Sequence, residues 1–98
     1  MHARTTFQTD QARRHLASLC QHFARKVPVL HDARSGHVEF PFGFCDLKAD
    51  STGLELIASA KDQAGLDTVI EVITSHLDRF AFRENPQLDW QQDAGSPP

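Results

Sequence analysis

Two stretches with helical spacing carry histidine and basic side chains that could form one site. His22 and Lys26 lie one helical turn apart in the first stretch, and His76 and Arg79 lie three residues apart in the second. Because each helical residue turns the side chain by about 100°, each pair borders the apolar stripe of its own helix. If the two borders face each other, the imidazoles of His22 and His76 would share a metal ion, a water molecule or an anionic group.

The chemistry of these four side chains favours an anionic, oxygen-rich ligand. A guanidinium group engages two oxygen atoms at once, and an ammonium group adds positive charge. We therefore predict His22, Lys26, His76 and Arg79 as ligand-binding residues, and the pattern identifies no cofactor. In the structural alternative these side chains only bury their apolar bodies at the edge of a packed stripe, with their polar ends in water.

A metal site built on two histidines would need a third ligand. Cys20, Cys45 and Asp46 are candidates, but no spacing argument selects one of them. The two cysteines occupy apolar positions without a CxxC motif, which is typical of inert core residues. Whether a metal binds is left open by the sequence.

The polar and aromatic residues allow two further interpretations. His76 as a general acid or base would require an orienting group and a pocket that excludes water, and no serine or cysteine nucleophile is paired with it. The segment FPFGF at 40–44 is either a stacking platform for a flat ligand or partner, or a tight hairpin whose rings close the end of the core.

Helical periodicity predicts two amphipathic helices that would carry the site. The first follows an edge strand at 3–8, is capped by Thr9 or Asp10, and ends before Pro28. The second runs from Asp62 to Phe82. Its predicted apolar stripe consists of Leu66, Val69, Ile70, Ile73, Leu77, Phe80 and Ala81, and Phe82 would seal the helix end.

The period changes to two between 29 and 59, which predicts an antiparallel meander of three or four strands. The predicted inward side chains are Val38, Phe40, Cys45, Leu47, Ala49, Leu54, Leu56 and Ala58. The predicted outward side chains are Glu39, Asp46, Lys48, Glu55 and Ser59. Leu88 and Trp90 alternate as a last strand, and 94–98 reads as a disordered tail.

The order β-α-β-β-β(-β)-α-β predicts an α+β two-layer sandwich, in which two helices cover one face of an antiparallel sheet. The arrangement resembles the TATA-binding-protein-like fold, and a ferredoxin-like variant is the alternative. We expect a single domain over 1–93.

Composition limits the partners of the domain. The formal net charge of −3 argues against nucleic acid, which normally binds a basic face. No run approaches the roughly 18 apolar residues needed to cross a bilayer, so we expect a cytoplasmic protein without a membrane partner.

Three blocks of the chain, LASLCQHFARKVPV, HVEFPFGFCDLKAD and SHLDRFAFRENPQLDW, resemble a bacterial family known as domain of unknown function 2218. Family members often read HFxHK where this chain has Arg25 in place of the second histidine, which weakens a metal site that needs it. The resemblance implies no established activity. It does imply an accessory role beside siderophore-interacting flavin reductases.

The leading hypothesis is therefore a binding domain linked to iron-siderophore handling, with an iron chelate or a reductase as its partner. The rivals are a small enzyme that uses His76, and a structural module that forms a homodimer through the outward sheet face or through FPFGF.

Overall fold

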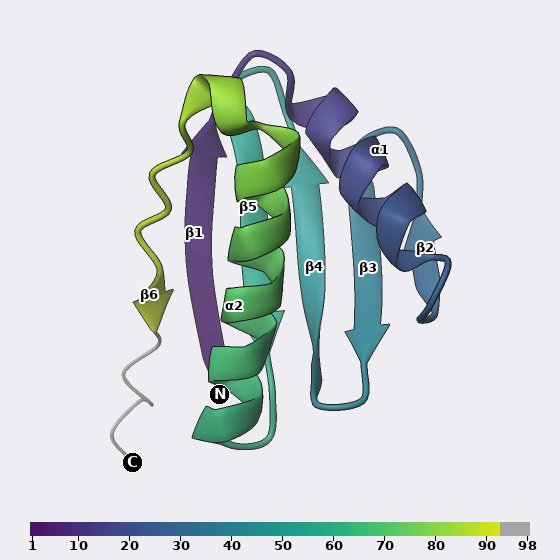
Figure 1. The fold of residues 1–98 in the computed structure, drawn as a ribbon, viewed down its shortest axis with the longest axis vertical. Helices are drawn as coiled ribbons and strands as arrows, with labels where there is room; N and C mark the ends of the chain where they lie inside the picture. The colour runs from purple at the N-terminus through teal and green to yellow at the C-terminus, as the bar shows by residue number, and fades with distance from the viewer. Residues whose placement is uncertain (93–98) are drawn as a thin grey trace.

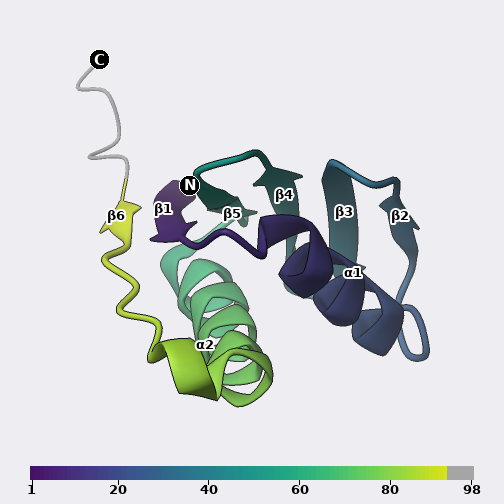
Figure 2. The ribbon, with the colours of Figure 1, turned by 90° about the horizontal axis from the view of Figure 1, so that it is seen from above.

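The computed structural model describes residues 1–92, which form one antiparallel sheet of six strands with two helices on one of its faces (Figure 1). The elements in chain order are β1 (His2–Gln8), α1 (Ala12–Phe23), β2 (Val29–His31), β3 (Ser35–Phe40), β4 (Gly43–Ala49), β5 (Gly53–Ser59), α2 (Gln63–Phe80), the 3-10 helix η1 (Phe82–Glu84) and β6 (Gln91–Gln92). Seen from above, both helices lie on the same side of the sheet (Figure 2). The predicted two-layer α+β sandwich is thus confirmed.

The strands follow the order β2-β3-β4-β5-β1-β6, and every pairing within residues 1–92 is antiparallel. The ferredoxin-like alternative, β-α-β-β-α-β, has two strands between its helices, whereas this chain has four, β2 to β5. Since β6 has only two residues, β1 is almost the edge strand that was predicted.

The core lies between the sheet and the two helices. Alternate residues of the central strands point toward the helices, because successive side chains of a strand leave opposite faces. The fully buried large side chains are Leu16, Leu19, Leu47, Leu54, Leu56, Leu66, Ile73, Leu77, Val38 and Val69. Burying each such side chain contributes about 1.5–3 kcal/mol, so this layer is the main source of stability.

Both helices are shorter than predicted. α1 begins at Ala12 with Gln11 at the N-cap, and the hydroxyl of Thr9 accepts a hydrogen bond from the Gln11 N–H at 3.0 Å. α1 ends at Phe23, ahead of Pro28, because the chain tightens into a turn in which the Lys26 N–H donates to the Phe23 carbonyl at 3.0 Å.

α2 begins where it was predicted and ends early. The Asp62 carboxylate caps it by accepting from the Gly65 N–H at 2.8 Å. Its last helical residue is Phe80. The short 3-10 helix η1 follows, and the chain turns at Asn85, which has a φ of 50°.

The predicted packing of two phenylalanines at the end of α2 is wrong. Phe80 is 41% exposed and Phe82 is 68% exposed. Ala81 takes the buried position, because the helix ends between the two rings and the backbone turns away from the core.

The last strand was also misplaced. Leu88 and Trp90 lie outside a strand, although both pack partly against the core, and Trp90 Nε1 donates to Thr74 Oγ1 at 3.0 Å. The strand is formed instead by Gln91 and Gln92, which pair with β1. The predicted tail at 94–98 lies outside the described residues.

Ser59 is the one predicted outward residue that is fully buried, with 4% exposure. It does point away from the helices, but the His2 side chain lies beside it and forms a 2.8 Å hydrogen bond between Nδ1 and the serine Oγ. Within residues 1–92, neither helix combines the length and the apolarity needed to cross a membrane.

Candidate functional site

The structure brings together the two histidines that the sequence singled out. α1 and α2 lie side by side on the sheet (Figures 1 and 2), and the ring centroids of His22 and His76 are 4.8 Å apart. The rings are tilted by 51°, and both side chains are half-buried. The polar borders of the two helices thus lie next to each other, as the hypothesis of a shared site requires.

The imidazole of His76 is fixed by its own helix. Its Nδ1 donates to the carbonyl oxygen of Val72 at 2.7 Å. Because a carbonyl only accepts, Nδ1 carries the proton, and Nε2 of the neutral ring presents a lone pair. A backbone carbonyl therefore orients this ring in place of a carboxylate.

Positive charge surrounds the two rings. The pKa of His22 is lowered by burial first, and then by the charges of His76, Lys26, Arg25 and Arg79. The ion pairs formed within residues 1–92 all involve His15 or His37, so none neutralises Arg25, Lys26 or Arg79.

We call these five residues, His22, Arg25, Lys26, His76 and Arg79, the cationic site. Four of them were predicted. Arg25 was missed as a contributor, although it stands where relatives were expected to carry a histidine and is adjacent to Lys26.

A chain of aromatic rings runs from the cationic site to the end of the sheet. His22 contacts the ring of Phe80 at a centroid distance of 5.6 Å. Phe23 lies 4.8 Å from His76 and 5.2 Å from Phe40. Phe40 in turn stacks on Phe42 at 5.2 Å, with an angle of 6° between the planes. The two helices and the β3–β4 hairpin thus share one layer of rings.

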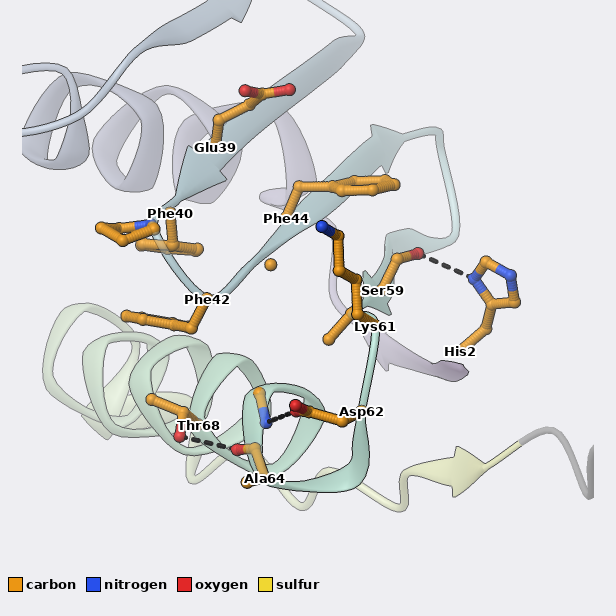
Figure 3. A pocket seen from close by; sticks show the side chains of 14 residues that line it. His2, Glu39, Phe40, Phe42, Phe44, Ser59, Lys61, Asp62, Ala64 and Thr68 are labelled. Atoms are coloured by element: carbon orange, nitrogen blue, oxygen red, sulfur yellow. Dashed lines mark hydrogen bonds between the residues drawn. The ribbon is translucent and has the colours of Figure 1, made fainter.

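The hairpin borders a pocket of about 670 Å³ (Figure 3). The hairpin, the connection from β5 into α2, and His2 all contribute to it. The lining side chains labelled in Figure 3 are His2, Glu39, Phe40, Phe42, Phe44, Ser59, Lys61, Asp62, Ala64 and Thr68. The volume suits a small molecule, and the phenyl rings give the pocket an apolar wall.

Both readings of FPFGF describe part of what is found. The segment is a tight hairpin, with Phe40 paired to Gly43, and its rings close one end of the core. Phe44 lies on the other face of the sheet, where its ring centroid is 5.1 Å from that of His37.

Two glycines let the β3–β4 hairpin approach its neighbours, α2 at Gly65 and the end of β5 at Gly43. A Cβ at Gly65 would lie 2.5 Å from the carbonyl oxygen of Phe42, and a Cβ at Gly43 would lie 2.4 Å from that of Ser59. Real Cβ atoms do not approach a carbonyl oxygen so closely. Both glycines also line the pocket, so this part of its wall requires glycine at both positions.

The candidates for a third metal ligand do not reach the two histidines. Cys20 and Cys45 are buried, and burial raises the pKa of the Cys20 thiol to about 11 and also raises that of Cys45. Asp46 lies on the opposite face of the sheet, where it accepts from His37 Nδ1 at 2.6 Å. In the part of the chain that the structure describes, no group of three or more His, Cys, Asp or Glu side chains is placed to hold a metal ion.

Two histidine networks were not foreseen from the sequence. His15 is 5% exposed, and its Nε2 donates to Glu84 Oε2 at 2.5 Å. The second carboxylate oxygen of Glu84 accepts from the Thr9 hydroxyl at 2.5 Å. His15 and Glu84 are 69 positions apart, so no local pattern could have linked them.

The second network is on the open face of the sheet. His37 donates from Nδ1 to Asp46 and from Nε2 to Glu39, the latter at 3.2 Å. The alternation that placed Glu39 and Asp46 outward was the available signal, since His37 shares their face through the pairing of β3 with β4.

Comparison with known proteins supports the resemblance drawn from the motifs. Among solved structures, the chain is similar to the NMR structure of PA4090 from Pseudomonas aeruginosa, with 27% identity and a TM-score of 0.79 over 92% of this chain and 94% of that chain. No protein in the curated set matches it. A family model described as an uncharacterized protein conserved in bacteria (DUF2218) matches residues 4–91. With nearly its whole length matched, the chain belongs to the DUF2218 family.

Proposed function

We propose that this domain is a binding module that recognises an anionic, oxygen-rich chelate of iron at the cationic site. The observation that carries the proposal is the gathering of three side-chain cations around two touching imidazoles, with no ion pair to a carboxylate among residues 1–92. Cations held close together repel one another, and an anion placed among them relieves that repulsion.

The donors present suit oxygen ligands. Arg79 offers the forked guanidinium group that engages two oxygens, and Nε2 of His76 is free to take part in a hydrogen bond. The exposed ring of Phe80 beside His22 adds a flat apolar surface for the aromatic part of a catecholate.

The context of siderophore handling is supported by the sequence motifs, which resemble a domain found beside siderophore-interacting flavin reductases. In this proposal the domain acts as an accessory to such a reductase and holds the ferric chelate that the reductase consumes. The iron arrives as part of the ligand and is not a resident cofactor.

The burial of both thiols favours binding over catalysis. Cys20 and Cys45 have raised pKa values, which keeps them protonated and unreactive. His76 has a carbonyl to orient it but no nucleophile to activate.

Isothermal titration calorimetry tests the proposal with two ligands, an anionic ferric catecholate complex and an uncharged ferric hydroxamate complex. We expect the catecholate to bind more tightly. We also expect Arg79→Gln to weaken it about tenfold or more, since a charge-assisted hydrogen bond contributes about 1.5–3 kcal/mol. His22→Ala and His76→Ala should weaken it as well.

Arg13→Gln is the matched control. Arg13 is also an exposed helical arginine, but it lies nine residues before His22, which puts it on the opposite side of α1. Catecholate binding that is unchanged in all three site variants, or weakened equally by Arg13→Gln, would remove the cationic site from the account.

A further inference from the structure

The face of the sheet opposite the helices presents an ordered row of side chains. Neither helix lies on this face within the described residues (Figure 2). The strand registers align one residue from each strand along a line across the sheet. From β2 to β6 the row is Leu30, His37, Asp46, Ile57, Arg4 and Gln91.

Ile57, on β5, is at the centre of this row. Hollows of about 430 Å³ and 500 Å³ lie on its two sides, and Ile57 lines both of them. Leu30, at the β2 end of the row, is 76% exposed and is separated from Ile57 by His37 and Asp46. Ile57 is half-buried, and covering the remaining exposed part of an apolar side chain between two hollows is favourable.

The charges on the two sides of Ile57 are opposite. Asp46, one strand away on β4, and Glu39 on β3 both pair with His37, and within residues 1–92 these carboxylates form no other ion pair. Arg4, one strand away on β1, forms no ion pair within residues 1–92. The His37 bond uses Oδ1 of Asp46, so Oδ2 is left for a second donor.

This arrangement is self-complementary under one particular symmetry. A two-fold axis parallel to β5, lying between two facing sheets, reverses the strand order but keeps each position along the strand. It places Asp46 of one copy opposite Arg4 of the other, twice, and Ile57 opposite Ile57. An axis perpendicular to the strands would instead oppose Asp46 to Asp46 and Arg4 to Arg4, which like-charge repulsion disfavours.

We propose that the open face of the sheet binds a second copy of this chain through an isologous contact with Ile57 at its centre and reciprocal Asp46–Arg4 pairs. Sheets that pack face to face stay roughly aligned at about 10 Å, which leaves room for these side chains to meet. The helix layer and the cationic site lie on the opposite face and remain open in the dimer.

Sedimentation equilibrium with charge variants tests the contact. We expect the wild type to dimerise, and Arg4→Asp and Asp46→Arg each to weaken dimerisation at least tenfold, because each places like charges at both reciprocal contacts. An equimolar mixture of the two variants should form a heterodimer, since one chain then carries two acidic groups and the other carries two basic groups. The double variant Arg4→Asp/Asp46→Arg should recover the homodimer.

The mixture also shows that both variants are folded, because an unfolded chain would not restore the contact. Glu71→Arg, on the exposed side of α2, is the matched charge reversal and should leave dimerisation unchanged, as should Arg79→Gln at the cationic site. The inference is overturned if the wild type stays monomeric at millimolar concentration. It is also overturned if the dimer dissociation constant does not change when the charges at positions 4 and 46 are reversed.

Discussion

His22 and His37 carry the same imidazole, but their surroundings shift its pKa in opposite directions. Cations and burial around His22 disfavour the charged ring, whereas two carboxylates around His37 favour it. His15 lies in a third setting, buried against a carboxylate that comes from the far end of the chain. The opposite pKa shifts of His22 and His37 thus follow from the neighbours of each ring and not from the residue type.

The protonation of His37 depends on Asp46 first and on Glu39 next, and these hydrogen bonds outweigh the opposing effect of burial. Its pKa is therefore expected above the ordinary value of 6.5. Stability from this network is fully present below pH 6.5 and is lost as the pH rises through the raised value. NMR titration of the ring, with His37→Gln as the comparison in unfolding experiments, measures both effects. A His37 that titrates below the unfolded value contradicts this.

For His22 the sign is opposite. Its folded pKa lies below 6.5, so the unfolded chain takes up the proton first, and stability falls as the pH drops through 6.5 toward the lowered value. We expect Arg79→Gln to raise the titration midpoint of His22, because one of the repelling charges is removed. The same NMR experiment on the variant measures the shift. An unchanged midpoint would mean that the charge of Arg79 does not act on His22.

Glu84 joins η1 to the start of α1. Its pKa is lowered by the Thr9 hydrogen bond first and by His15 next, so its contribution to stability is present above the ordinary value of 4.5 and is lost as the pH falls through the lowered value. Glu84→Ala should lower the free energy of unfolding by about 1–3 kcal/mol, because it leaves the buried His15 without a partner. Denaturant unfolding at pH 7 measures this. Glu71→Ala, at an exposed helical position, should change stability by less than about 0.5 kcal/mol.

At the scale of elements, α2 packs on the sheet and, near its start, against the β3–β4 hairpin. The hairpin carries Phe40 and Phe42 against the helices, and Gly65 near the start of α2 faces its backbone. The Asp62 cap fixes that start, so α2 has little freedom to move aside. The pocket beside the hairpin and the stacked rings of Phe40 and Phe42 both depend on the contact between Gly65 and the hairpin backbone.

Gly65→Ala tests the contact. Helix propensity alone would make alanine more stable by about 1 kcal/mol. The added Cβ would meet the Phe42 carbonyl at 2.5 Å, so we expect a net loss of about 1–3 kcal/mol in thermal or denaturant unfolding. Ser75→Ala, at an exposed position of the same helix, serves as the control. A gain in stability from Gly65→Ala would mean that the hairpin does not press on α2.

At the scale of the whole molecule, one core serves a sheet with two different faces. The helix side contains the core and carries the cationic site at the seam between α1 and α2. The open side carries the row centred on Ile57. The proposed ligand and the proposed second copy of the chain would therefore not compete for the same surface, since the sheet separates the two faces.

Leu56 tests the single core. It is fully buried on β5 in the layer that both helices cover. Leu56→Ala should cost about 2–5 kcal/mol, a large part of the total of about 5–15 kcal/mol that holds a domain of this kind. We expect the helical circular dichroism signal and the Trp90 fluorescence to change in one shared unfolding transition. Two separate transitions would contradict a shared core.

The sequence by itself determined the layers and the sides of the site. Alternation at 29–59 assigned inward residues such as Val38 and Leu56 correctly, and the helical stripes placed His22 and His76 each at the border of its own stripe. These patterns are local, because burial on one face imposes a period of two on a strand and of about 3.6 on a helix. The motifs also placed the chain in its family.

Only the tertiary structure decided which side chains meet across long separations and where the elements end. The His15–Glu84 pair, the burial of Ser59 beside His2, and the exposure of Phe80 depend on how the N-terminal strand and the segment that ends α2 pack on the rest of the fold. No periodicity records these contacts, because they join residues that are remote in sequence and are fixed by packing. For the same reason, the alignment of Asp46, Ile57 and Arg4 in one row follows from the strand register and could not be read from the chain alone.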